Sequence, residues 1–196
     1  YILLNNEASF KSILMFIVPA VLILLCVPVL NNKYNFVDVA VSVLGFIYIP
    51  VFFSFIVLTD VKMHGRYLVW LIFLSSWGCD TFAYYSGKLL GKHKLCPKIS
   101  PNKTIEGSIG GFLGSIIICS IFGILIKYNL GINIQIYHYA ILGAISGIIC
   151  QFGDLAASSI KRYVRIKDYS HIIPGHGGIL DRFDSILFAS VVVYYY

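Results

Sequence analysis

The chain of 196 residues is 58% hydrophobic and only 12% charged. Soluble domains are about half apolar and about one quarter charged, so this composition argues against a soluble domain and indicates an integral membrane protein. The net charge of +6 is basic, but in a chain with several spans such charges set topology and bind anionic headgroups or phosphates, so we expect no nucleic-acid partner.

Apolar segments follow one another along the whole chain. A helix that crosses a bilayer needs about 20 mostly apolar residues. Pro19, Pro28 and Pro50 lie in or at the ends of the first two segments and predict kinks rather than breaks. The pattern predicts an all-α, polytopic helical bundle of about six spans, and the start at Tyr1 rather than Met leads us to expect that the true N-terminus is missing. The predicted spans are residues 12–30, 36–59, 67–85, 107–126, 136–152 and about 185 to the end.

The connections between these segments predict the orientation in the membrane. If the spans alternate, the loops at residues 31–35, 86–106 and 154–184 share one side and carry most of the Lys and Arg residues. Such a bias marks the cytoplasmic side, and we expect a bacterial inner membrane. We predict N-terminal transmembrane helices in residues 1–66 and a catalytic region in residues 67–196, with the two long loops facing the cytoplasm.

Glycine spacing predicts close packing between helices. G-x-x-x-G steps allow two helix backbones in a membrane to approach closely. These steps also permit a homodimer, although they do not require one. They involve Gly107, Gly110, Gly111 and Gly114, and again Gly143 and Gly147.

The segment from Ile99 to Gly107 is the first of three polar elements. Ser100 followed by Pro101 predicts a helix N-cap with proline in the first helical position. A helix N-terminus beside Lys103 and Thr104 suits a phosphate group. The alternative is an ordinary capped helix start, and the segment is not a P-loop.

The second element contains Asp154, Ser158 and Lys161, which share one helix face at i, i+4 and i+7. An acid, a hydroxyl and an ammonium in a row suit a metal ion beside a phosphate, although an ordinary Asp–Lys pair at a solvated helix end is the alternative. Arg162 follows directly. Asp80 lies within the third predicted span, and an acid at such a depth rarely faces lipid, so it either contributes to a polar site or pairs with a lysine.

The third element runs from His176 to Ser185. Gly177 and Gly178 allow a tight turn where an oxyanion can approach backbone amides. Asp181 and Asp184, one helical turn apart, are oxygen ligands of the kind that Mg²⁺ prefers. Arg182 either contacts a phosphate or neutralises its neighbours, and a lone His such as His176 is more often structural than catalytic.

Other reaction centres are not evident in the sequence. It has no Ser–His–Asp triad and no H-E-x-x-H, and its five cysteines form no C-x-x-C pair. The residues therefore indicate a metal-assisted phosphate site at a membrane, open to the cytoplasm.

With these motifs in view, the chain resembles the phosphatidate cytidylyltransferases, also called CDP-diacylglycerol synthases. Their long C-terminal pattern, which ends in H-G-G-[apolar]-x-D-R-x-D, is met in full between Ser158 and Asp184. Their S-P-[KN]-K-T-x-E-G segment is similar to residues 100–107, and their G-D-L step to residues 153–155. The resemblance also implies further N-terminal spans before those of this chain.

The resemblance implies transfer of a cytidylyl group from CTP to phosphatidate, with release of pyrophosphate. It also implies a site dependent on Mg²⁺, with Mn²⁺ as the alternative, in which Asp154 and Asp181 hold the metal. We predict Asp184 and Asp80 as further contributors to the metal site. The residues predicted to bind or position phosphate groups are Lys103, Lys161, Arg162, Lys167, Arg182, Ser100, Thr104, Ser158, His176, Gly177 and Gly178.

Two other readings remain open at the level of sequence. The nearest is a related CTP-using lipid enzyme, such as a polyprenol or phytol kinase or an archaeal CDP-ether-lipid synthase. A transporter or channel is the other, and it would distribute charges at mid-depth over several spans. Here the charges gather at one face, in the long loops.

Overall fold

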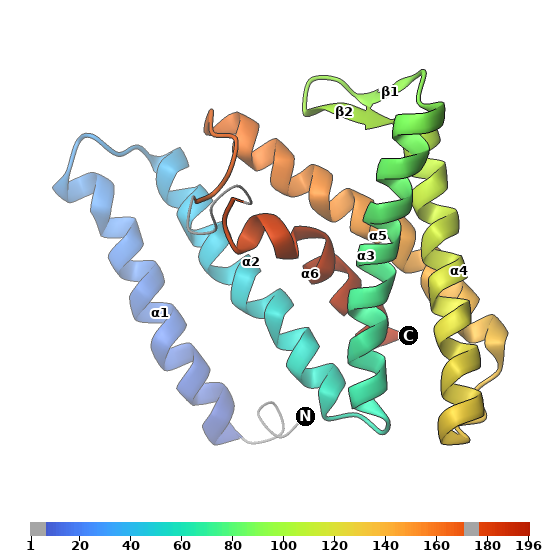
Figure 1. Ribbon diagram of the computed structural model, residues 1–196. Coiled ribbons are helices and arrows are strands. Elements are labelled where there is room, and N and C mark those ends of the chain that lie inside the picture. Colours follow the sequence, from blue (N-terminus) through green and yellow to red (C-terminus); the bar gives the residue numbers. More distant parts are fainter. Residues whose placement is uncertain (1–6, 171–176) are drawn as a thin grey trace. The chain divides into compact units, whose positions relative to one another are not determined.

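The computed structural model describes residues 7–170 and 177–196, and His176 lies outside them. This part of the chain contains six helices and one small β-hairpin (Figure 1). Residues 1–54 and 55–196 form two compact units. The predicted boundary between residues 66 and 67 stays a prediction. The elements are α1 (Glu7–Leu30), α2 (Phe36–Asp60), α3 (Gly65–Leu90), β1 (Lys94–Cys96), β2 (Ser100–Thr104), α4 (Ile105–Leu130), α5 (Ile136–Tyr163) and α6 (Leu180–Tyr195).

In the first unit, a capping box starts α2. The Asn35 side chain accepts hydrogen bonds from the backbone N–H groups of Val37 (2.8 Å) and Asp38 (3.1 Å). The carboxylate of Asp38 accepts the N–H of Asn35 in return, at 2.9 Å. This reciprocal arrangement satisfies the free donors of a helix N-terminus. Both α1 and α2 are helical through their prolines, which agrees with the expectation that these residues do not end the helices.

The second unit packs α3, α4, α5 and α6 around one apolar core. Apolar side chains separated by helical spacings face inward, and small residues let the helices approach. The most buried members include Leu71 and Ile72 on α3, Cys119 on α4, Cys150 on α5 and Leu187 on α6. The thiols of Cys119 and Cys150 are thus part of the apolar core.

The predicted glycine contacts are confirmed. A Cβ atom added at Gly111 on α4 would lie 2.8 Å from the carbonyl oxygen of Cys79 on α3. One added at Gly143 on α5 would lie 2.8 Å from the carbonyl oxygen of Ser115 on α4. At Gly153 the added atom would lie 2.8 Å from the carbonyl oxygen of Asp184, so α5 and α6 approach each other closely beside Asp154. Glycine is required at these crossings because helix backbones touch there.

Three of the described helices, α2, α4 and α5, are long and apolar enough to cross a membrane. The chain is thus a helical membrane protein, in agreement with the predicted fold class. The predicted spans in α1, α3 and α6 are also helical, but they do not meet the same criterion in the described residues. The total of six spans therefore stays a prediction.

The start of α4 corrects one prediction. Ser100 and Pro101 do not cap a helix but belong to β2, which pairs antiparallel with β1. Helix α4 begins four residues after Pro101, at Ile105, and Thr104 is its N-cap, with its side-chain oxygen accepting the N–H of Gly107 at 3.1 Å. Proline lacks an N–H and is tolerated in an edge strand, so Pro101 fits a two-stranded hairpin. The all-α prediction did not include this hairpin.

Candidate active site

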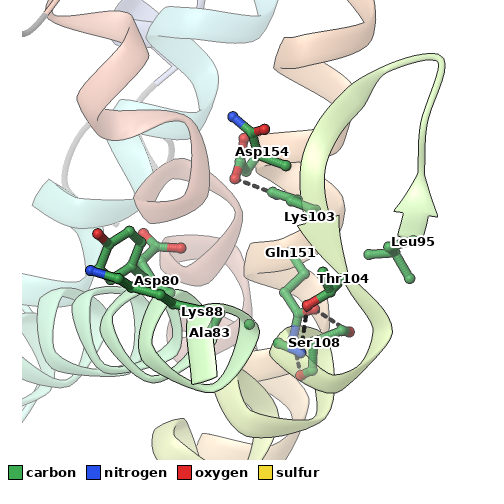
Figure 2. A pocket seen from close by; sticks show the side chains of 13 residues that line it. Asp80, Ala83, Lys88, Leu95, Lys103, Thr104, Ser108, Gln151 and Asp154 are labelled. Carbon is green, nitrogen blue, oxygen red and sulfur yellow. Dashed lines mark hydrogen bonds and ion pairs between the residues drawn. The ribbon is translucent and has the colours of Figure 1, made fainter. Parts of the chain in front are cut away.

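A pocket of about 440 Å³ lies between α3, the hairpin, α4 and α5 (Figure 2). Asp80 and Lys88 face it from α3, Lys103 from β2 and Asp154 from α5. It thus collects charged side chains of both signs from three separate parts of the chain. Because the hairpin lies at the end of α3 where α4 begins (Figure 1), the pocket is at one end of the bundle. This is the arrangement expected for a polar site at a membrane surface.

Within the pocket, the ammonium group of Lys103 forms an ion pair with the carboxylate of Asp154 (Figure 2). The other oxygen of Asp154 accepts a hydrogen bond from Ser158 at 3.3 Å, one helical turn along α5. The two paired side chains are 27% and 28% exposed, so both remain accessible. The shared face predicted for Asp154 and Ser158 is confirmed, but the cation beside Asp154 is Lys103.

Two further carboxylates approach Asp154. Asp80 accepts a hydrogen bond from Ser185 at 3.2 Å, and Ser185 is bonded in turn to Ser76 at 2.7 Å. Asp80 and Asp184 each interact electrostatically with Asp154 and with each other. Acids from α3, α5 and α6 therefore influence one another electrostatically, and such negative charge favours a nearby cation.

Asp181, in contrast, belongs to a buried ion pair. Its Oδ1 lies 2.7 Å from Nζ of Lys161, and the two side chains are only 7% and 10% exposed. Asp184 interacts electrostatically with Lys161 as well as with Asp154. Asp184 therefore interacts electrostatically with one member of each ion pair, Lys103–Asp154 and Lys161–Asp181.

The glycine turn before α6 surrounds Asp181. Oδ2 of Asp181 accepts the N–H groups of Gly178 and Tyr169, each at 2.9 Å. Gly177 has a φ of 77°, a backbone conformation that glycine adopts without strain. We predicted that these amides approach an oxyanion of the substrate, whereas in the structure the Gly178 amide binds a carboxylate of the protein itself.

The surroundings of Asp181 determine the protonation of two groups. Burial raises the pKa of Asp181, but its bonds from Lys161, Gly178 and Tyr169 outweigh this effect, and the net direction is downward. Asp181 therefore remains ionised. Burial also raises the pKa of Tyr169 to about 12, and the charges of Asp181 and Asp184 add to the rise. Tyr169 stays a neutral phenol, with its hydroxyl donating to the carbonyl oxygen of Ala157 at 3.2 Å.

Other predicted phosphate ligands lie away from the pocket. Arg162 donates to the carbonyl oxygens of Ile99 and Ile166, each at 3.2 Å, and so connects the end of α5 to the hairpin. Ser100 and Lys167 do not line the pocket, and Lys167 is exposed. Arg182 is also exposed, on the first turn of α6. Of the predicted set, Lys103 and Thr104 line the pocket together with Asp80 and Asp154.

Hydrogen bonds to Glu106 hold the hairpin that carries Lys103 against α4. One carboxylate oxygen of Glu106 lies 2.7 Å from Nδ1 of His93, and both oxygens accept the backbone N–H of His93 at 3.3 Å. The backbone N–H of Ile105 also donates to the carbonyl oxygen of His93, at 2.9 Å. These bonds hold the start of β1 against the first turn of α4.

Replacement of Glu106 by Ala should loosen this hairpin. The change removes the acceptor for both the ring and the backbone of His93, whereas His93→Ala removes only the ring contact. We expect limited digestion with trypsin to cleave at Lys94 and Lys98 several-fold faster in Glu106→Ala, with a smaller increase in His93→Ala. Equal cleavage rates in wild type and Glu106→Ala would contradict this role.

Sequence reasoning missed several polar residues that line the pocket, among them Lys88, Asn102 and Gln151. Lys88 lies two turns after Asp80 on α3, so their common helix face was available as a signal. Gln151 lies in an apolar span one turn before Asp154, where a polar amide is itself unusual. Asn102 gave no comparable signal, because its position depends on the hairpin.

The donor set fits a hydrated divalent cation. Among residues 7–170 and 177–196, no three Asp, Glu, His or Cys side chains form a complete metal cage. Mg²⁺ is usually held by one or two carboxylates, with water and substrate phosphates completing its shell. Asp80 and Asp154 face the same pocket, so they provide oxygen ligands of the required kind. Asp181 accepts hydrogen bonds from Lys161, Tyr169 and Gly178, which use most of its about four acceptor positions, so it has less capacity left for a metal.

Fold and site together define a class: helical membrane proteins with a charged pocket at one end of the bundle. The family model described as the cytidylyltransferase family matches residues 2–196. The chain belongs to this family.

Bacterial relatives are similar over most of the chain. A protein of Staphylococcus saprophyticus is 39% identical over 184 residues, and one of Bacillus subtilis is 38% identical over 178. These alignments cover 93% and 90% of this chain, but 67% and 65% of the relatives. A protein of Staphylococcus haemolyticus is 42% identical over 167 residues, covering 85% of this chain and 62% of the relative. All three relatives are named phosphatidate cytidylyltransferase.

Proposed function

We propose that this chain contains the active site of a phosphatidate cytidylyltransferase. The reaction joins CTP and phosphatidate into CDP-diacylglycerol and releases pyrophosphate. The observation that carries the proposal is the pocket in which Lys88 and Lys103 face Asp80 and Asp154 at one end of a membrane bundle. The names of the relatives and the matching motifs support the same reaction.

The chemistry demands neutralisation of charge rather than proton transfer. An ionised phosphate oxygen of phosphatidate attacks the α-phosphorus of CTP and forms a new P–O bond. The bond between the α-phosphorus and the bridging oxygen breaks, and pyrophosphate leaves with that electron pair. Both reactants are anions, so cations and in-line positioning supply most of the acceleration.

Side chains of the pocket meet this demand. Lys103 and Lys88 bind phosphate oxygens, and Thr104 lies at the N-terminus of α4, where the helix dipole favours an anion. Asp154 and Asp80 hold Mg²⁺, with Asp184 nearby and Mn²⁺ as the alternative ion. When bound, the ion neutralises the phosphate charge that develops during the transfer. In this proposal, binding of the nucleotide separates Lys103 from Asp154.

The role of metal ligand predicted for Asp181 stays a prediction. Its contacts support a second role: together with Lys161 it fixes the start of α6 and thereby the position of Asp184. Arg162 supports the hairpin in the same way through Ile99.

The test is turnover by the full-length protein in detergent or vesicles. With phosphatidate and radiolabelled CTP, we expect CDP-diacylglycerol and pyrophosphate in equal amounts, with turnover lost on addition of EDTA and restored by excess Mg²⁺. Release of CDP in place of pyrophosphate would instead indicate a lipid kinase. Unchanged turnover in EDTA would contradict the metal assignment.

The bacterial inner membrane, with the pocket facing the cytoplasm, is the location that we propose. The bias of Lys and Arg toward the two long loops supports it, and CTP is available on that side. The homodimer stays a prediction.

A further inference from the structure

A second cavity, called here the α4–α5 groove, lies beside the charged pocket. It also measures about 440 Å³, but apolar side chains provide most of its lining. Several of them are exposed in the helical unit: Ile109 is 55%, Ile148 46% and Phe152 62% exposed. In a membrane such side chains face lipid. The apolar members of the lining include Leu95, Ile109, Phe112, Ile148, Phe152 and Leu155.

The groove adjoins the charged pocket. Leu95, Ser108 and Gln151 line both cavities. On one side of these three residues lie the charges of Lys103 and Asp154, and on the other side the lining is almost entirely apolar. A charged cavity and an apolar cavity are therefore neighbours that share part of their lining.

At the boundary between the two cavities, Gln151 and Ser108 are hydrogen-bonded to each other. The Gln151 amide donates to the carbonyl oxygen of Ser108 at 3.1 Å, and its oxygen accepts the hydroxyl of Ser108 (Figure 2). The amide also donates to the carbonyl oxygen of Gly147 at 3.0 Å. Both N–H donors of Gln151 are thereby used. The pair joins α4 to α5 and carries no charge. It therefore marks the change from the charged lining of the pocket to the apolar lining of the groove.

We propose that the α4–α5 groove binds an acyl chain of the lipid substrate while the phosphate of that lipid lies in the charged pocket. This inference rests on the proposed function and specifies how a diacyl phosphate is held. An anionic headgroup attached to an apolar chain matches the two adjoining cavities. A free nucleotide or inorganic phosphate matches only the charged one.

The groove contributes orientation rather than a large gain in affinity. An acyl chain that moves from the bilayer into the groove exchanges one apolar environment for another, so little hydrophobic free energy is gained. Confinement of the chain instead limits the directions from which the phosphate approaches the α-phosphorus. Such positioning increases the rate of a reaction between two bound substrates.

A tryptophan placed in the groove tests the proposal. In the full-length protein, we expect Ile148→Trp to raise KM for phosphatidate at least five-fold and to leave KM for CTP unchanged. Ile145→Trp is the matched control, because Ile145 lies on the same helix with 41% exposure but does not line the groove. Equal KM values for phosphatidate in the two variants would overturn the proposal.

Photocrosslinking provides a measurement that does not depend on turnover. Phosphatidate with a diazirine at the end of one acyl chain is compared with diacylglycerol bearing the same chains. We expect phosphatidate to label peptides containing Ile109, Ile148 or Phe152 several-fold more than diacylglycerol does. Equal labelling by both lipids would show only contact with bulk lipid and would overturn the proposal.

Absence of labelling by either lipid in active protein would also overturn it, since another segment of the full-length protein would then cover the groove. Failure of the proposed function gives a different result. In that case no CDP-diacylglycerol forms at all, while selective labelling by phosphatidate still reports whether the groove binds its chain.

Discussion

Replacement of Asp181 by Asn is expected to lower the free energy of unfolding by about 3 kcal/mol, because it removes one member of a buried ion pair. Lys161 would keep its charge at 8% exposure without the carboxylate that now lies 2.7 Å away. The bonds from Gly178 and Tyr169 would also weaken, since an amide oxygen accepts less strongly than a carboxylate. We therefore expect a lower melting temperature together with loss of turnover.

A double-mutant cycle separates this effect from a general loss of packing. Lys161→Met removes the other charge, and the double variant Asp181→Asn, Lys161→Met leaves neither charge buried. If the ion pair is the cause, the double variant should be less destabilised than the sum of the two single changes. Additive losses in thermal unfolding in detergent would show that the pair does not act as a unit.

Replacement of Asp154 by Asn should reduce turnover by at least about 100-fold. In contrast to Asp181→Asn, it should change the free energy of unfolding little. Its ion pair with Lys103 is partly exposed on both sides, and such pairs contribute at most about 1 kcal/mol. The loss of a charged metal ligand beside the phosphates removes stabilisation of the transition state, and single electrostatic groups of this kind typically contribute about 100-fold or more.

The measurement is the rate of CDP-diacylglycerol formation at saturating CTP, together with the melting temperature. Asp60→Asn serves as the control, since Asp60 is an exposed acid at the end of α2 that does not line the charged pocket. A rate for Asp154→Asn within a few-fold of the control would remove Asp154 from the metal site. A large fall in its melting temperature would show that the ion pair has a structural role.

The contrast between these two acids illustrates what the motif pattern left open. Asp154 and Asp181 have the same expected role in the motif, and their chemistry is identical in isolation. Their difference comes from the enclosure of Asp181 by Tyr169 and the glycine turn, whereas Asp154 remains beside a pocket. This enclosure depends on how the segment with Lys161 and Tyr169 folds back onto Asp181, so it could not be predicted from the spacing of the motif.

Local features of the sequence determined the class of protein and its helices. The apolar segments predicted all six helices, because the length of a hydrophobic run directly limits what can cross a bilayer. The spacing of Gly107, Gly111 and Gly143 predicted the close helix contacts, since a helix presents residues at regular intervals on one face. The motifs around Lys103, Asp154 and Asp181 also predicted which part of the chain carries the charged site.

Only the tertiary structure decided which charges meet. Lys161 shares a helix face with Asp154 in the sequence pattern, yet it pairs with Asp181, twenty residues away, and Asp154 pairs with Lys103 from the hairpin. A hairpin occupies the place of the predicted helix start: its two strands pair with each other, and Thr104 rather than Ser100 caps the helix. Ion pairs form between whichever side chains the packed helices bring within reach, and that geometry belongs to the bundle rather than to any single segment.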